Sequence, residues 1–148
     1  MSLLDQVVTA LTGLGWQVEL DDEHPGGMLL EPAEGEAPWP FVAQVDAEER
    51  QVAFYSLLPD EVPEQRRTAV ADVLTDANYA LMVGSFEIDL ADGDVRVRTS
   101  LDLGEAELGA TQLAALLAPL VRHNLTAMDA WVEAIQAVAD GAEPGELS

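Results

Sequence analysis

Hydrophobic positions at the start of the chain follow first a helical and then a strand period. Apolar residues recur every three to four positions over residues 2–14, which predicts an amphipathic helix. Ser2 is placed to act as its N-cap, and Gly13 or Gly15 to end it. The next stretch, "WQVEL" at 16–20, alternates apolar and polar residues and predicts a half-buried strand.

Residues 21–38 interrupt this order. They contain "DDEHPGG" and "PAEGEAP" on either side of a brief apolar piece, "MLLE", and their prolines, glycines and acids predict an acidic surface loop. The pattern after the loop predicts a hairpin, with strands at 39–45 and 51–58 and a turn at 46–50.

A second helix is predicted after Pro63, which suits the first position of a helix. It extends over residues 64–77 and buries Val70, Val73, Leu74 and Ala77. Asn78 follows directly. Because asparagine tolerates the left-handed conformation that commonly ends helices, we expect Asn78 to form the C-terminal cap.

A second hairpin is predicted around Asp92-Gly93, since two strands of period two flank this dipeptide. A two-residue turn would pair Ile88 with Val97 and Glu87 with Arg98, so that apolar residues meet apolar residues and opposite charges meet. Gly84, ahead of the first strand, marks a bulge or a close approach of two backbones.

The end of the chain carries a wide apolar helical stripe over residues 111–140. Pro119 removes one backbone hydrogen bond, so we expect one bent helix or two consecutive helices. Residues 141–148 are expected to be a disordered tail. The prediction is a single α+β domain over 1–148, with an antiparallel sheet of about five strands flanked by helices in the order α-β-β-β-α-β-β-α.

The charge is strongly negative. The 148 residues include 28 acids, six arginines and no lysine, giving a net charge of −22. Such a surface repels nucleic acids and anionic membranes, so neither is expected as a partner. It favours solubility or reflects composition, with a basic protein partner as the alternative. Without a predicted membrane span or leader peptide, we expect a cytoplasmic protein.

Candidate chemistry is sparse. The absence of cysteine excludes disulfides and thiolate ligands. The "DDEH" loop at 21–24 has the residue types of a divalent metal site but no fixed geometry, so no metal or cofactor is predicted. His123 has no recognisable partner to orient it as a general base. These observations favour a protein that is not an enzyme.

The cations and aromatic residues are the best candidates for partner contact. We predict that Trp39, Phe41, Arg96 and Arg98 lie on the outward side of the sheet and contact a protein partner. The alternatives are that the aromatic residues belong to the core, and that the arginines form ordinary cross-strand pairs that contribute only about 0.2–1 kcal/mol each.

The run "RRTAVADVLTDANYALMVGSFEIDLADGDVRVRTSLDL" and the helix after it resemble the YbjN family of bacterial sensory transduction regulators over about residues 40–138. The positions that carry the resemblance are Arg67, Asn78, Gly84, Phe86, Asp92, Gly93 and Arg98. It implies a fold similar to type III secretion chaperones, which are small, acidic, dimeric proteins that hold a stretch of another protein. We therefore expect a homodimeric chaperone or adaptor. A regulatory docking domain is the main alternative, and a metal- or small-molecule-binding protein is less favoured.

Overall fold

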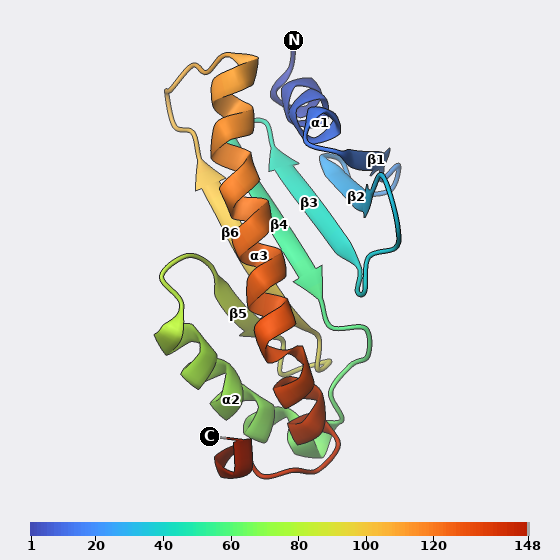
Figure 1. Ribbon diagram of the computed structural model, residues 1–148, viewed down its shortest axis with the longest axis vertical. Helices are drawn as coiled ribbons and strands as arrows, with labels where there is room; N and C mark the ends of the chain where they lie inside the picture. The colour runs from blue at the N-terminus through green and yellow to red at the C-terminus, as the bar shows by residue number, and fades with distance from the viewer. Residues whose placement is uncertain (148) are drawn as a thin grey trace.

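The computed structural model describes residues 1–147 and contains three α-helices and six strands in that range (Figure 1). Their bounds are α1 Leu3–Gly13, β1 Trp16–Leu20, β2 Gly27–Pro32, β3 Phe41–Asp46, β4 Gln51–Leu57, α2 Arg67–Ala80, β5 Ser85–Ile88, β6 Val95–Asp102 and α3 Ala110–Ala139. Short 3₁₀ turns at Glu64–Arg66 and Pro144–Leu147 precede α2 and follow α3. The Ser2 hydroxyl caps α1 as predicted, by accepting from the Asp5 N–H.

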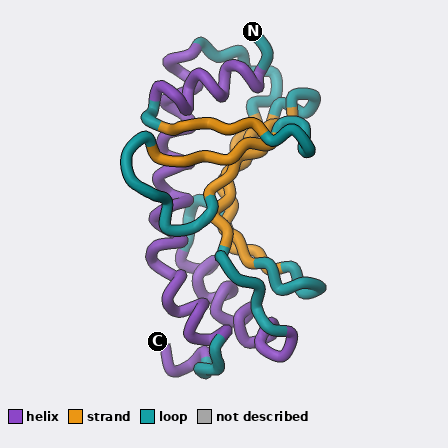
Figure 2. The backbone as a smooth tube through the Cα atoms, turned by 90° about the vertical axis from the view of Figure 1, so that its right-hand side faces the viewer, coloured by secondary structure: helices purple, strands orange, loops and turns teal. Residues whose placement is uncertain are grey.

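The strands form one antiparallel sheet in the order β1-β2-β3-β4-β6-β5. Figure 2 shows the helices on one side of this sheet. The predicted α+β class is confirmed, with one strand more in the order than expected. The additional strand is β2, which lies inside the predicted acidic loop 21–38 and pairs with both β1 and β3.

The core lies between the sheet and the helices, and alternate residues of each strand point into it. In β4, for example, Val52, Phe54 and Ser56 are buried while the residues between them are partly exposed. The predicted buried residues of α2, Val70, Val73, Leu74 and Ala77, are confirmed. The burial pattern therefore separates each strand into a helix-facing side and an outer side.

The long helix α3 is continuous, with Pro119 inside it, so the alternative of two consecutive helices is wrong. It crosses the sheet diagonally (Figure 1). After α3, Pro144–Leu147 forms a 3₁₀ turn that packs near α2. Ser148 of the predicted disordered tail lies outside the described residues.

The β5–β6 hairpin has a longer loop than predicted. Ile88 pairs with Val95 and Glu87 with Arg96, so the register differs by two residues from that of an Asp92-Gly93 turn. A four-residue loop results, closed by bonds from Asp89 N to Asp94 O and from Gly93 N to Asp89 O. Because the shift is even, every side chain keeps the face that the sequence pattern predicts.

Asn78 does not cap α2 in a left-handed conformation, because the helix continues to Ala80 and Arg50 is the single non-glycine residue with positive φ in the described chain. Its amide instead pairs with the backbone of Phe86: Oδ1 accepts from the Phe86 N–H (2.6 Å) and Nδ2 donates to the Phe86 carbonyl (3.1 Å). β5 is an edge strand, and this side chain occupies polar groups that another chain would need for strand pairing.

Replacing Asn78 by alanine should therefore lower the free energy of unfolding by about 1–2 kcal/mol, since two hydrogen bonds to partly buried backbone groups are lost. Amide exchange at Phe86 should rise with it. Asp72→Ala, a truncation at an exposed position of the same helix, is the control and should cost under about 0.5 kcal/mol. Equal losses in the two variants would mean that the Asn78 pairing has no special role.

Candidate protein-binding face

The outer side of the sheet carries no helix, and the strands curve away from the helices at both ends to leave this side concave (Figure 2). Its centre holds a hollow of about 770 Å³. The floor consists of Leu29, Val42, Gln44 and Tyr55, and Arg96 and the loop 21–24 form its walls. A smaller hollow of about 250 Å³ shares Arg96 and continues toward the β5–β6 loop. The face can therefore receive an extended segment across several strands.

Two arginines and one carboxylate form the charged centre of this face. Glu87 Oε1 accepts from Arg96 Nε, and Glu87 Oε2 contacts Arg98 Nη2, both at 2.9 Å. The Arg96 guanidinium also stacks on the Tyr55 ring at 4.3 Å from its centroid. The three charged side chains are partly exposed and together carry one net positive charge. This centre can bind an acidic group of a ligand.

Carboxylates surround the positive centre. Burial raises the pKa of the Asp94 carboxyl, and the charge of Asp92 raises it further, against the opposing effect of Arg96. At the other end of the face, the hydrogen bond from the Glu23 N–H lowers the pKa of Asp21, and His24, whose Nδ1 lies 2.8 Å from Asp21 Oδ2, lowers it further. The acidic rim would favour basic groups in a bound segment.

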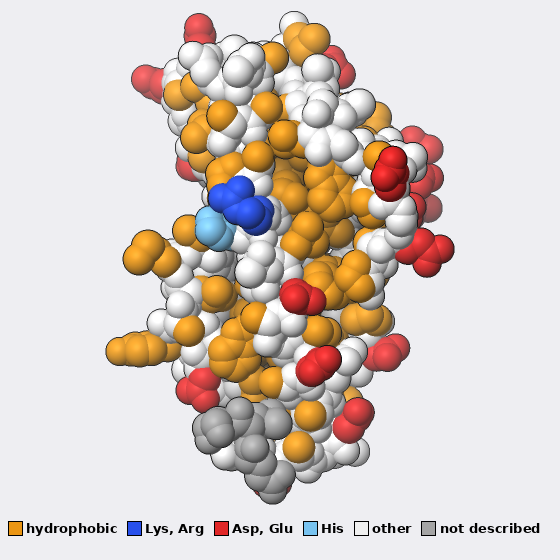
Figure 3. Space-filling model, viewed as in Figure 1, with side chains coloured by type: hydrophobic (Ala, Val, Ile, Leu, Met, Phe, Trp, Pro, Cys, Tyr) orange, Lys and Arg blue, Asp and Glu red, His pale blue; other side chains and the backbone are white. Residues whose placement is uncertain are grey.

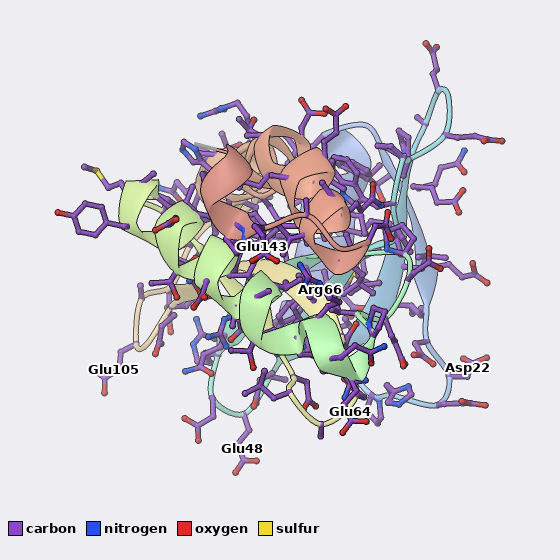
Figure 4. The ribbon with its side chains drawn as sticks, turned by 90° about the horizontal axis from the view of Figure 1, so that it is seen from below. Asp22, Glu48, Glu64, Arg66, Glu105 and Glu143 are labelled. Atoms are coloured by element: carbon purple, nitrogen blue, oxygen red, sulfur yellow. The ribbon has the colours of Figure 1, made fainter. Side chains whose placement is uncertain are left out.

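Three other arginines stabilise the fold through backbone carbonyls. Arg50 donates to Gly104 and Ala106, and Arg67 to Val62, Leu90 and Ala91. Arg66 donates to the carbonyls of Val138, in the last turn of α3, and of Ala142 beyond the helix. Figure 4 shows Arg66 beneath this C-terminal turn, while the carboxylates of Asp22, Glu48 and Glu105 point outward. These arginines are not available to a partner.

The predicted contact residues divide into two groups. Arg96 and Arg98 lie on the outer face as expected. Trp39 and Phe41 do not: they are 8% and 0% exposed and belong to the core, so their predicted placement on the outward side is wrong. Phe41 pairs with buried Ser56 on the helix-facing side. The polar residues Gln44 and Asp46 on the alternate positions of β3 indicate this orientation.

The remaining predicted structural positions lie around the β5–β6 hairpin. Gly84 has φ +87°, and an added Cβ would lie 2.9 Å from the Arg98 carbonyl oxygen, which confirms the close backbone approach. Phe86 is buried, and Asp92 accepts from the Asp94 N–H within the loop. These residues support the hairpin that presents Arg96 and Arg98.

Two features were missed by sequence reasoning. Tyr55 and Val42 on the outer face occupy the outward positions of alternating strands, which the period-two pattern identifies. Asn124, fully buried, breaks the apolar stripe of α3 and signals a polar contact in the core. Its side chain bonds to Ser56, Thr99 and the carbonyls of Phe54 and Val97.

Within the "DDEH" loop, the side chains of Asp21 and His24 pair with each other, and within residues 1–147 no three histidine or acidic side chains are placed to hold a metal ion together. His123 is exposed on α3. Within residues 1–147, no helix combines the length and apolarity that a membrane span requires.

The fold is thus an α+β domain whose sheet is covered by helices on one side and leaves a concave face of mixed charge on the other. The chain belongs to the YbjN family: the family model, described as "Putative bacterial sensory transduction regulator", matches residues 3–137.

Two solved structures share this fold. A crystal structure of YbjN, described as "a putative transcription regulator from E. coli", matches with a TM-score of 0.67 and 15% identity, over 88% of this chain and 91% of that one. An uncharacterized protein from Methanothermobacter thermautotrophicus matches with a TM-score of 0.54 and 12% identity, over 91% of this chain and 97% of that one. A comparison with curated proteins finds no match.

Proposed function

We propose that this protein is a non-enzymatic chaperone or adaptor that holds a segment of a partner protein on the outer face of its sheet. The observation that carries the proposal is the uncovered, concave face with its hollow of about 770 Å³ around Tyr55 and Arg96. An extended segment laid across this face would place apolar side chains over Leu29 and Val42.

The charges on the face define the segment that fits it. The Arg96–Glu87–Arg98 centre has one net positive charge and suits a single acidic side chain. The carboxylates of Glu19, Asp22 and Glu23 border the same hollow and suit basic side chains at one end of the segment. A partner segment with an apolar middle, one acidic residue and a basic end fits this arrangement.

A regulatory docking domain is the second candidate. The description of the family as a sensory transduction regulator favours it. In this case the same face would bind a folded signalling or stress-response protein. The two candidates differ in the state of the partner: a chaperone binds a segment excised as a peptide, whereas a docking domain needs the folded partner.

A homodimer also remains a prediction. Tyr79, in the last turn of α2, and Met82, in the segment that joins α2 to β5, are 97% and 98% exposed. Exposed apolar side chains of this size are typical of contact surfaces. They lie beside the β5 edge, away from the hollow of the outer face. A dimer formed here would leave the proposed binding face free.

The proposal predicts that Arg96→Ala/Arg98→Ala weakens partner binding by about tenfold or more, because the acidic group of the partner loses its charged hydrogen bonds. Partners are captured from native cytosol at moderate salt with the wild-type bait and identified by mass spectrometry. Their affinities for both baits are then measured by calorimetry on purified proteins.

Arg122→Gln, which removes a cation on the helix-facing side, is the matched control and should leave this affinity unchanged. Circular dichroism checks that each bait is folded, since the double variant leaves Glu87 without its partners. Unchanged affinity of the folded double variant would contradict binding at the charged centre. Equal losses in control and double variant would point to net charge alone.

A further inference from the structure

Another hollow, of about 350 Å³, lies on the helix-facing side between the end of α1 and the middle of α3. Apolar side chains make up most of its lining, namely Leu14, Trp16, Ala118, Val121 and Leu125. Arg122 and Thr126, one turn apart on α3, contribute its polar groups. Figure 3 shows basic side chains at mid-height of this side, bordered by a broad apolar area. We call this hollow the α1–α3 groove.

Arg122 differs from the other five arginines. Each of those donates to a carbonyl or pairs with Glu87, whereas Arg122 is exposed and has no hydrogen-bond or ion-pair partner within the described chain. The chain has 28 acidic residues, yet the groove lining includes no carboxylate. The groove therefore combines apolar walls with one unpaired positive charge, which complements an apolar anion.

The size of the groove favours a small occupant. A volume of about 350 Å³ is at the lower end of the range of about 300–1,000 Å³ for small-molecule sites. A stable protein partner commonly contacts about 20–30 residues on each side, many more than line this groove. One guanidinium, with its planar pair of donors, matches one carboxylate.

We propose that the α1–α3 groove binds a small molecule with an apolar chain or ring and a single carboxylate. The apolar part lies against Trp16 and Leu125, and the carboxylate accepts from the Arg122 guanidinium, with the Thr126 hydroxyl within the same rim. This site is on the opposite side of the sheet from the outer face and does not rest on the proposed partner binding.

The test uses decanoate, below its micelle-forming concentration, as the probe. Titration should shift the fluorescence of Trp16 and give a saturable affinity, confirmed by calorimetry. Arg122→Gln should weaken binding by about tenfold or more, and Arg122→Lys should restore part of it. Arg98→Gln, a matched loss of charge on the outer face, should leave the affinity unchanged. Trp16→Phe should remove most of the fluorescence shift while calorimetry still detects binding.

Three results would overturn the proposal. The first is the absence of saturable decanoate binding to the folded protein. The second is a result that gives the positive charge no role. Equal binding of decanoate and decyltrimethylammonium would be such a result, and so would an unchanged affinity of Arg122→Gln for decanoate. The third is a dimer, detected by sedimentation, that dissociates in Leu14→Ser and is unaffected by decanoate, which would assign the groove to a second copy of the chain.

Discussion

Replacing Asn124 by leucine should lower the free energy of unfolding by about 3–4 kcal/mol. Asn124 is fully buried, and its Oδ1 accepts from the Ser56 hydroxyl (2.6 Å) while Nδ2 donates to the Phe54 carbonyl (2.8 Å). Leucine has a similar volume but leaves these buried groups without their partner. Chemical denaturation should measure the loss, and the melting temperature should fall by roughly 10 °C.

A double-mutant cycle shows whether the loss comes from the polar cluster. Thr99 joins it by donating to the Leu120 carbonyl and accepting from Asn124. In a Ser56→Ala/Thr99→Val background, Asn124→Leu should cost clearly less, since two of its partners are already apolar. Gln136→Leu, at an exposed position of α3, controls for the helix itself. An equal cost of Asn124→Leu in both backgrounds would contradict the cluster.

Replacing Gly93 by alanine should destabilise the protein by about 3 kcal/mol or more. Gly93 has φ +82°, and an added Cβ would lie 2.2 Å from the Val62 carbonyl oxygen and 2.7 Å from Arg67 Nε. Both neighbours are held in place, because Val62 N donates to the Gly93 carbonyl and Arg67 donates to three carbonyls around the loop. The β5–β6 loop would have to move away from Val62.

Substitutions at two further glycines distinguish the two causes of this loss, the backbone strain and the contact with Val62. Gly15 has φ +98° but no neighbour within 4 Å of an added Cβ, so Gly15→Ala should cost only the backbone strain of about 1 kcal/mol. Gly13, in α1, has neither feature, so Gly13→Ala should be neutral or slightly stabilising. If Gly93→Ala cost no more than Gly15→Ala, the contact with Val62 would not constrain the loop.

The sequence pattern predicts the elements and their faces well, because these depend on local periodicity. The two hairpins, the helix after Pro63 and the outward position of Arg96 and Arg98 agree with the structure. The loop length at Gly93 was not predictable in this way. It depends on Arg67 and Val62, which are distant in sequence and reach the loop only in the folded protein.

The binding face is harder to predict than the fold. Residue type predicts an outward position for Trp39 and Phe41, whereas the alternation in β3 places Phe41 on the buried side. Local turn chemistry predicts Asn78 as a helix cap, but its amide pairs with the backbone of Phe86, eight residues later. The hollow around Tyr55 depends on the curvature of the sheet and on β2, which lies within the predicted acidic loop and pairs with β1 and β3.

Site-specific photocrosslinking tests the central claim, that the outer face binds a protein partner, most directly. A benzophenone amino acid replaces Tyr55 on the floor of the hollow or, as the control, Leu116, which is exposed on α3. After irradiation in cells, adducts are identified by mass spectrometry. The account predicts one dominant protein adduct at position 55, reduced by Arg96→Ala/Arg98→Ala and absent at position 116. Equal adducts at both positions, or adducts at 116 alone, would contradict it.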